Sequence, residues 1–451
     1  MTSKQRRSVI ILAGVVLLAF LSLAFTRGLV DFPIYHISGR SLMQGRLNIY
    51  APEFSGGPGM TYRYPPFFLI ATLPLSLLPY PVAAHVWYWL SIGMIAGIVR
   101  IIRLVIAHVK SRLRVWVVVF FAVAQYYVMQ LRYGNAHLLI VFLMFASLYF
   151  ASRKKDWVAG LLMALSISIK VTPVLILPYF ALRKRWNYLL AITVFLLPIN
   201  LVPAGYFGYA KNAELLQTWF AHVLFDKDFH EVNGPINLSL KGQLRRYLTD
   251  VDYSKRVLGD TRYPSINIAS LTTGQADAIW AVISASSMLG TLAFLWWLPK
   301  RKDRADPKAE GADIETARDS EGREAKGLIN EPLQLGLMIS LMLFIGPLSS
   351  KIYFTALLWP IACLATQVFA NEARTPVFCK NALLAICVAN TVLPLLPGRS
   401  LQRLFLVLGI DFYLNGLLLI ALVLTLISIR RALQAPGDER QTQALSATRT
   451  S

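Results

Sequence analysis

Long apolar runs recur along almost the whole chain, and short polar segments separate them. They lie at 8–27, 82–106, 114–131, 136–151, 187–203, 276–298, 333–350, 352–370, 380–397 and 404–429. An apolar run of about 20 residues can cross the hydrocarbon core of a bilayer as one helix. The pattern therefore predicts an all-α integral membrane protein, a polytopic bundle of helices.

The run Trp157–Phe180 (WVAGLLMALSISIKVTPVLILPYF) is longer and contains a lysine. As one helix it would hold Lys170 near the bilayer centre, which costs several kcal/mol. It would also place the basic clusters at 153–155 and 183–185 on opposite sides of the membrane, against the positive-inside rule. We therefore predict two short helices that meet at Lys170–Pro173, with Lys170 at the outer surface.

A short, proline-bounded run at 65–79 (PPFFLIATLPLSLLP) is predicted to be interfacial or re-entrant. The basic segment 100–114 should be cytoplasmic and the loop after the first run outside, so one crossing, at 82–106, belongs between them. With the two half-helices included, this gives about twelve spans with both termini cytoplasmic. Long extracytoplasmic loops then lie at 28–64 and 204–273, and we expect interfacial helices there.

Composition agrees with this class of protein. The chain has 451 residues, of which 56% are hydrophobic and 15% charged, and its mean hydropathy of +0.52 is too high for a soluble protein. The net charge of +21 would suggest nucleic acid in a soluble protein. Here Lys and Arg at the cytoplasmic ends of helices explain it, so no nucleic-acid partner is predicted. The run at 9–25 follows KQRR, as in a signal peptide, but lacks a clean small-residue cleavage site, so we interpret it as a retained span.

The polar segment 300–327 divides the chain. Its charge and lack of periodicity predict disorder. The predicted organisation is an N-terminal module at 1–299, a cytoplasmic linker at 300–332, a helical bundle at 333–430 and a disordered cytoplasmic tail at 431–451. The cysteines lie in or beside apolar runs without CxxC spacing, so neither a disulfide framework nor a zinc site is predicted.

The first outer loop places an acid directly after an apolar run. Asp31 is followed by Tyr35 and His36, and then by Tyr64 in TYRYPP (61–66). A neighbour of low dielectric constant raises the pKa of a carboxyl group towards that of a working base. By position alone, however, a solvated carboxylate at a helix end is the simpler interpretation of Asp31.

Hydrogen-bond donors and cations are predicted on the same face. The turn QLRYGNAHLL (130–139) holds Arg132, Asn135 and His137 beside a flexible glycine, although by itself it is typical of a plain helical hairpin. Lys170 lies at the same level. So does Lys351, with Tyr353, in GPLSSKIYFTALLWP (346–360).

The second outer loop contains GPINLSLKGQLRRYL (234–248). Asn237 and Ser239 could bind a polar ligand, while Arg245 and Arg246 form a basic cluster with Lys241. The arginine fork can bind two phosphate oxygens, but a basic cluster near a membrane is by default a surface for lipid headgroups. Together these residues favour a lipid-phosphate substrate, with the carboxylate free to activate an acceptor hydroxyl.

The order of these segments resembles glycosyltransferase family 87. The matching segments, in the family's order, are Asp31-Phe32, Gly45 to Tyr50 (one residue longer than usual), Tyr64-Pro65-Pro66, Pro74-Leu75, RYGNAHLLIVFL, AGLLMALSISIKVTP, NLSLKGQLRR and LSSKIYFTALLWP. Departures from the family pattern are Asn135 and His137 for Gln and Asn, Ala164 for Gly, Leu238 for Gln, and Tyr353 for His. The resemblance runs from residue 31 to about 360.

The resemblance implies a GT-C-type membrane glycosyltransferase. Such an enzyme, a hexosyltransferase, would transfer one sugar, with mannose as the leading candidate, from a polyprenyl-phosphate donor to a glycolipid or glycan at the outer face of the bacterial cytoplasmic membrane. It implies that Asp31 is the general base of an inverting displacement, with Lys170, Lys351, Arg245 or Arg246 binding the donor phosphate. Neither a metal nor another cofactor is expected. His36 and His137 are candidates to replace the family histidine.

Two other functions remain open from the sequence. One is a transporter or flippase of lipid-linked sugars, which would predict inverted repeats with broken helices. No such repeat is evident. The other is a glycan ligase or polymerase that uses a diphosphate-linked donor. Sugar transfer in detergent would separate the first from an enzyme, and a comparison of monophosphate and diphosphate donors would separate the second.

Overall fold

The computed structural model describes residues 28–57, 60–107, 112–224, 234, 236–250, 263–298, 331–371, 375–396 and 398–434. The predicted first span at 8–27, the polar segment 300–327 and the tail from residue 435 lie outside the described residues. Within these ranges the chain is helical and contains no strand, which confirms the all-α prediction. The helices form two compact units, and each unit is built from several stretches of sequence.

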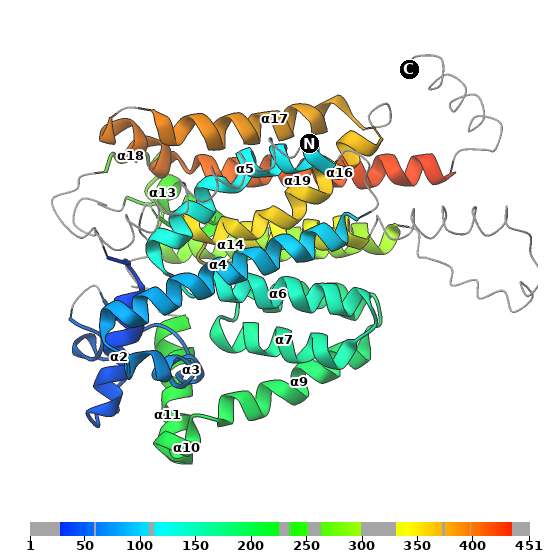
Figure 1. The fold of residues 1–451 in the computed structure, drawn as a ribbon. Coiled ribbons are helices and arrows are strands. Elements are labelled where there is room, and N and C mark those ends of the chain that lie inside the picture. Colours follow the sequence, from blue (N-terminus) through cyan, green and yellow to red (C-terminus); the bar gives the residue numbers. More distant parts are fainter. Residues whose placement is uncertain are drawn as a thin grey trace, which may run out of the picture. The chain divides into compact units, whose positions relative to one another are not determined.

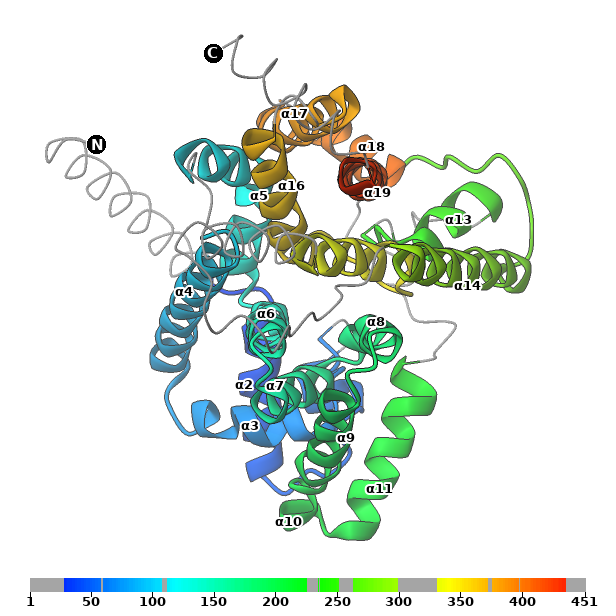
Figure 2. The ribbon, with the colours of Figure 1, turned by 90° about the vertical axis from the view of Figure 1, so that its right-hand side faces the viewer.

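Among the residues that the structure describes, the first unit comprises those within 28–101, 126–174 and 186–224. It holds α2 (Phe32–Met43), η1 (Pro52–Phe54), α3 (Pro66–Ser76), most of α4 (Tyr80–Val105), the end of α5 (Arg112–Tyr133), α6 (His137–Ser152), α7 (Asp156–Ile169), α9 (Trp186–Leu201), α10 (Ala204–Phe207), α11 (Tyr209–Thr218) and the π-helical η3 (Trp219–Leu224). The helices α6, α7 and α9 lie side by side, as Figures 1 and 2 show. The short helix α2 packs on α3.

Among the residues that the structure describes, the second unit comprises those within 102–125, 175–185 and 234–434. Its elements are the beginning of α5, α8 (Leu177–Leu182), α13 (Leu240–Leu248), α14 (Thr273–Trp297), a helix at Glu331–Ile345, η5 (Lys351–Leu357), α16 (Leu358–Ala370), α17 (Val377–Val392), η6 (Leu393–Leu395), α18 (Arg399–Leu408) and α19 (Ile410–Gln434). Here α13 packs on α14, and α16 and α17 pack on α19. The two units are defined by contacts within the fold and not by the polar segment 300–327. The predicted organisation, with modules at 1–299 and 333–430, therefore stays a prediction.

Seven described helices are long and apolar enough to cross a membrane. They correspond to the predicted runs at 82–106, 114–131, 187–203, 276–298, 352–370, 380–397 and 404–429. The segments Pro66–Ser76, His137–Ser152, Asp156–Ile169, Thr172–Leu182 and Glu331–Ile345 are shorter apolar helices. The total of about twelve spans and the assignment of loops to one membrane face stay predictions.

The predicted break at Lys170 is confirmed. The helix α7 ends at Ile169, and Lys170 has extended backbone angles (φ −152°, ψ 131°). A 3₁₀ segment, η2 (Thr172–Ile176), follows, and its proline at position 173 cannot supply an N–H to a continuing helix. The second stretch of the first unit ends within this segment, at residue 174.

Polar and small residues hold α6, α7 and α9 together. The Ser147 hydroxyl donates to the Ala159 carbonyl at 2.6 Å and lies 2.7 Å from the Tyr188 hydroxyl, so one buried group joins all three helices. Gly160 lets α7 approach α9 closely. A methyl group at Gly160 would lie 2.9 Å from the carbonyl carbon of Ala191.

We therefore expect Gly160→Ala to destabilise the protein by about 1–3 kcal/mol, because the added methyl forces α7 away from α9. The measurement is thermal unfolding of the purified chain in detergent. Gly290→Ala on α14 is the matched control, since a methyl there meets nothing within 4 Å and a helical alanine is favourable. Equal melting temperatures for the two variants would contradict the expectation.

Candidate functional site

Asp31 is fixed at the entrance of α2 by contacts to the turn between α5 and α6. Its backbone N–H donates to the Tyr133 carbonyl at 2.8 Å. Its carboxylate Oδ2 accepts a hydrogen bond from Asn135 Nδ2 at 2.7 Å. Asp31 and Asn135 are 104 residues apart in sequence, so this pair brings the two predicted motifs together within the first unit.

A second hydrogen bond fixes the orientation of the Asn135 amide. Its Oδ1 accepts from the backbone N–H of His137 at 2.8 Å. A carboxamide has one acceptor oxygen and one donor nitrogen. Because the oxygen faces the His137 N–H, the nitrogen must face Asp31. Asn135 therefore sets the direction in which the Asp31 carboxylate points.

The turn itself is held on several sides. Gly134 has a φ of +63°, which glycine adopts without strain. Its carbonyl accepts from the Trp87 indole N–H at 2.8 Å. The Gln130 side-chain amide donates to the Asn135 carbonyl at 2.5 Å. The next N–H, of Ala136, donates to the Tyr35 hydroxyl at 3.0 Å. The prediction that Gly134 gives this turn its backbone freedom is thus confirmed.

Aromatic side chains build the surroundings of this turn. Phe32 stacks on Trp87 with ring centroids 5.6 Å apart, and the Tyr35 and Tyr64 hydroxyls are 2.9 Å apart. Tyr50 donates to the Tyr64 carbonyl at 3.2 Å. Burial raises the pKa of Tyr50 above its ordinary value. Its hydroxyl therefore stays a neutral hydrogen-bond donor at physiological pH.

The two histidines and Arg132 have different surroundings. A ring N–H of His36 donates from Nε2 to the Leu78 carbonyl at 3.0 Å, and the ring packs edge-on to Tyr80. His36 therefore joins α2 to the segment between α3 and α4. His137 begins α6 and is buried, whereas Arg132 is exposed. The structure places His137 next to Asn135 in the turn, and it gives His36 the Leu78 carbonyl as a partner.

Lys170 directly follows a residue of the same aromatic core. The residue before it, Ile169, belongs to one buried cluster with Phe32, Tyr35 and Trp87. The extended backbone at Lys170 then carries the chain away from α7, and its side chain is partly exposed. Within the first unit, the structure thus gathers Asp31, Tyr35, Tyr64, Asn135, His137 and the backbone of Lys170 around one aromatic core.

The remaining predicted site residues belong to the second unit. Asn237 is fully buried, and its Oδ1 accepts from the N–H groups of Ser239 and Ser349, each at 3.1 Å. Its Nδ2 donates to the Pro347 carbonyl at 3.1 Å. Ser239 caps α13, since its hydroxyl accepts from the Gly242 N–H at 3.3 Å. Asn237 therefore joins the segment before α13 to the segment before Lys351.

Both predicted arginines are buried against protein partners. Arg245 donates to Asp277 through Nε at 2.7 Å and through Nη2 at 2.5 Å. Arg246 donates from Nη1 to the Asn237 carbonyl at 2.7 Å. Lys241 also contacts Asp277, at 3.2 Å. The prediction that Arg245 and Arg246 bind phosphate stays a prediction, and these contacts already give each of them a structural role.

Lys351 pairs with an acid that sequence reasoning missed. Its ammonium lies 3.7 Å from the Asp411 carboxylate, and the side chains are 26% and 10% exposed. Tyr353, in the same 3₁₀ segment, is buried. Asp411 and Asp277 both interrupt apolar runs in the sequence, and an acid inside a predicted span is a signal of function or pairing. That signal would have found both residues.

No metal centre can be assembled from the side chains that the structure describes. Among them, no three His, Cys, Asp or Glu side chains come together in an arrangement that could hold an ion. The expectation of chemistry without a metal stays a prediction.

Comparison with known proteins decides the family. Residues 62–312 match the model of Glycosyltransferase family 87, which is more than half of the chain. The chain belongs to glycosyltransferase family 87. This confirms the predicted family. The match includes Tyr64, Asn135, Lys170 and Asn237, but it begins after Asp31 and ends before Lys351.

Curated relatives come from mycobacteria. A polyprenol-phosphate-mannose-dependent alpha-(1-2)-phosphatidylinositol pentamannoside mannosyltransferase of Mycolicibacterium smegmatis is 29% identical over 35% of this chain and 38% of its own length. A phosphatidylinositol mannoside mannosyltransferase of that organism is 28% identical over 40% and 44%. A pentamannoside mannosyltransferase of Mycobacterium tuberculosis is 25% identical over 58% and 59%. The chain thus matches 38% to 59% of the length of these relatives. No solved structure matches it significantly.

The buried ion pair in this family 87 chain gives a stability prediction. Asp277→Asn leaves the Arg245 guanidinium, whose side chain is 2% exposed, without its counter-charge, and we expect a loss of about 3–5 kcal/mol. Replacing both Asp277 and Arg245 by leucine should recover most of this loss, because the buried guanidinium is then gone and the remaining cation, Lys241, is more exposed. Thermal unfolding of the purified chain measures both effects.

Lys211→Ala is the control, because it breaks an exposed pair with Glu214 and should cost less than about 1 kcal/mol. A double leucine variant that is no more stable than Asp277→Asn would contradict the structural role of Arg245.

Proposed function

We propose that this chain transfers one mannosyl residue from a polyprenyl-phosphate donor to a glycolipid acceptor at the extracytoplasmic face of the cell membrane. The family match and the names of the mycobacterial relatives support the sugar, the donor and the acceptor class. The seven long apolar helices support a membrane enzyme. The observation that carries the proposal is the Asp31 carboxylate, held in one orientation by Asn135 at 2.7 Å.

Asp31 is the general base in this proposal. As the acceptor hydroxyl attacks the anomeric carbon of the donor sugar, a carbon–oxygen bond forms on one face and the bond to the phosphate oxygen breaks on the other. The acceptor proton passes to Asp31, and the polyprenyl phosphate leaves as a monoester. A base must point at the proton that it removes, and the contacts of Asn135 with Asp31 and His137 supply that direction.

Cations stabilise the departing phosphate in this proposal. A role of Lys170 in binding the phosphate is supported by its place in the chain. It directly follows Ile169, which lies in the same buried core as Phe32 and Tyr35. Lys351 is supported by its position beside Ser349 and Asn237, in a segment that the structure fixes through several hydrogen bonds. Arg245 and Arg246 remain candidates, although Arg245 donates from two fork nitrogens to Asp277 and Arg246 donates from Nη1 to the Asn237 carbonyl.

The first test replaces the proposed base. Asp31→Asn keeps an oxygen that can accept from Asn135, so the fold should survive, while proton removal is lost. We expect transfer from polyprenyl-phosphate mannose in detergent to fall by at least about 100-fold. Asp156→Asn is the control, since Asp156 also lies in the first turn of a helix of the same unit. Near-wild-type turnover by Asp31→Asn, with an unchanged melting temperature, would remove Asp31 from this role.

The second test concerns the donor phosphate. Lys351→Ala should raise the KM for the donor by about tenfold, which corresponds to about 1.4 kcal/mol, and should leave the KM for the acceptor almost unchanged. Steady-state kinetics with each substrate varied in turn measure the two constants. Lys380→Ala on α17 is the control for removal of a lysine from the second unit. An equal rise in both constants for Lys351→Ala would contradict a contact to the donor phosphate.

A further inference from the structure

The helix α4 has two faces with different environments. One face is buried in the core of the candidate site: Trp87 packs on Phe32 and donates to the Gly134 carbonyl. The adjacent face carries large apolar side chains that the protein leaves exposed, including Val82, Trp89 and Leu90 at 48%, 50% and 51%. Both faces belong to the same turns of one helix.

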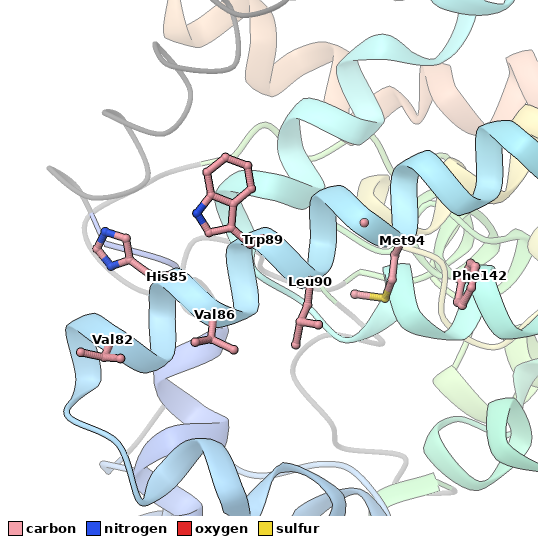
Figure 3. Close-up of a pocket in the computed structure, with 8 residues that line it drawn as sticks. Val82, His85, Val86, Trp89, Leu90, Met94 and Phe142 are labelled. Atoms are coloured by element: carbon pink, nitrogen blue, oxygen red, sulfur yellow. The ribbon is translucent and has the colours of Figure 1, made fainter.

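The exposed face contains a groove with a volume of about 600 Å³. Val82, Val86, Leu90 and Met94 follow one another along α4, and Phe142 of α6 lines the end of the groove near Met94 (Figure 3). Phe142 in turn packs against the buried cluster that includes Phe32 and Tyr35. The groove therefore shares a wall with the core of the candidate site.

Gly93 leaves this groove open. A methyl group built on Gly93 would meet nothing within 4 Å, whereas one on Gly97, a turn later, would meet the Phe142 ring. The absence of a side chain at position 93 exposes the helix backbone between Leu90 and Met94. Any larger residue there would occupy the groove itself.

The dimensions fit one linear hydrocarbon chain. From Val82 to Met94 the rise of an α-helix gives a length of about 18 Å, and half of a bilayer's hydrocarbon core is about 15 Å thick. The first turns of α4 also carry Tyr80 and the exposed Trp89, and such aromatic residues are typical of a membrane interface. Arg100 and Arg103 lie at the opposite end of the helix.

The groove has a polar end. His85 lies among its lining residues, near the beginning of α4, and its Nδ1–H donates to the Pro81 carbonyl at 2.6 Å. From there to Met94 the lining offers only apolar side chains and the Trp89 indole (Figure 3). The shape suits an amphiphile whose polar head lies near His85 and whose tail follows α4.

We propose that this groove holds the polyprenyl chain of the donor substrate. This inference rests on the proposed function, because the donor class comes from it. The groove is one strip along a single helix, which accommodates one tail. A polyprenyl phosphate has one tail, whereas a phosphatidylinositol-based acceptor has two acyl chains. The shared wall at Phe142 lets the head of a chain seated here approach the core around Asp31 and Asn135.

Gly93→Leu tests the groove, because leucine fills it at a position with open space and favours the helix. The donors are heptaprenyl-phosphate mannose and geranyl-phosphate mannose. The geranyl tail is shorter than the stretch from His85 to Gly93, about 12 Å. We expect the KM for the heptaprenyl donor to rise about tenfold and the KM for the geranyl donor to stay unchanged. Gly290→Leu, at an equally open glycine on α14, should change neither constant.

Three kinetic outcomes would overturn the proposal. They are an unchanged KM for the heptaprenyl donor, an equal rise for both donors, and a rise in the KM of the acceptor alone, which would assign the groove to an acyl chain of the acceptor. A change of the same size in Gly290→Leu would show that the effect is general to lipid-facing helices, and would overturn it as well.

A binding measurement separates this inference from the proposed function. Heptaprenyl phosphate with a photoreactive benzophenone at its tail should label peptides from 82–94 in the purified wild type, and Gly93→Leu should lose that label. Labelling by a chain that shows no mannosyl transfer would support the groove and count against the proposed function. Transfer without labelling of 82–94 would keep the function and overturn the groove.

Discussion

The hydrogen bond from Asn135 to Asp31 is the contact on which the arrangement of the first unit depends. It joins the entrance of α2 to a turn more than a hundred residues later. The backbone polar groups of that turn need partners, since an unpaired buried group costs as much as a lost hydrogen bond. Trp87, Gln130 and Tyr35 supply them, so the turn that orients Asp31 is fixed by groups from α2, α4 and α5.

Rigidity of this kind matters for a base that works near a membrane. A carboxylate at a helix entrance can swing into solvent, where water competes for its lone pairs. Here the backbone that carries the carboxylate is fixed, because the Asp31 N–H donates to the Tyr133 carbonyl and the next residue, Phe32, lies in a packed core. The side-chain amide of Asn135, itself oriented by the His137 N–H, then restricts the direction of the carboxylate further.

Local features of the sequence were predictable, and long-range partners were not. Gly134 in its turn and the break at Lys170–Pro173 follow from glycine and proline chemistry that acts over a few residues. The partner of Asp31, and the use of His36 to bind the Leu78 carbonyl, depend on how distant segments pack. The shorter helices also show a limit, because α6 and α7 are apolar but of 16 and 14 residues, so length alone does not decide whether they cross the membrane.

The basic segment of the second unit combines a structural ion pair with an excess of positive charge. Asp277 is one carboxylate shared by Lys241 and Arg245, so this group of three carries a net positive charge. Both hydrogen bonds of Arg245 to Asp277 come from a buried, planar fork, and such a geometry is lost if the arginine turns to another ligand. Lys241 contacts Asp277 and lies over the face of Trp280 at 4.8 Å, and an ammonium can redirect its donors without breaking a paired geometry. The positive charge in excess is therefore carried by the lysine rather than by the arginine that the motif emphasises.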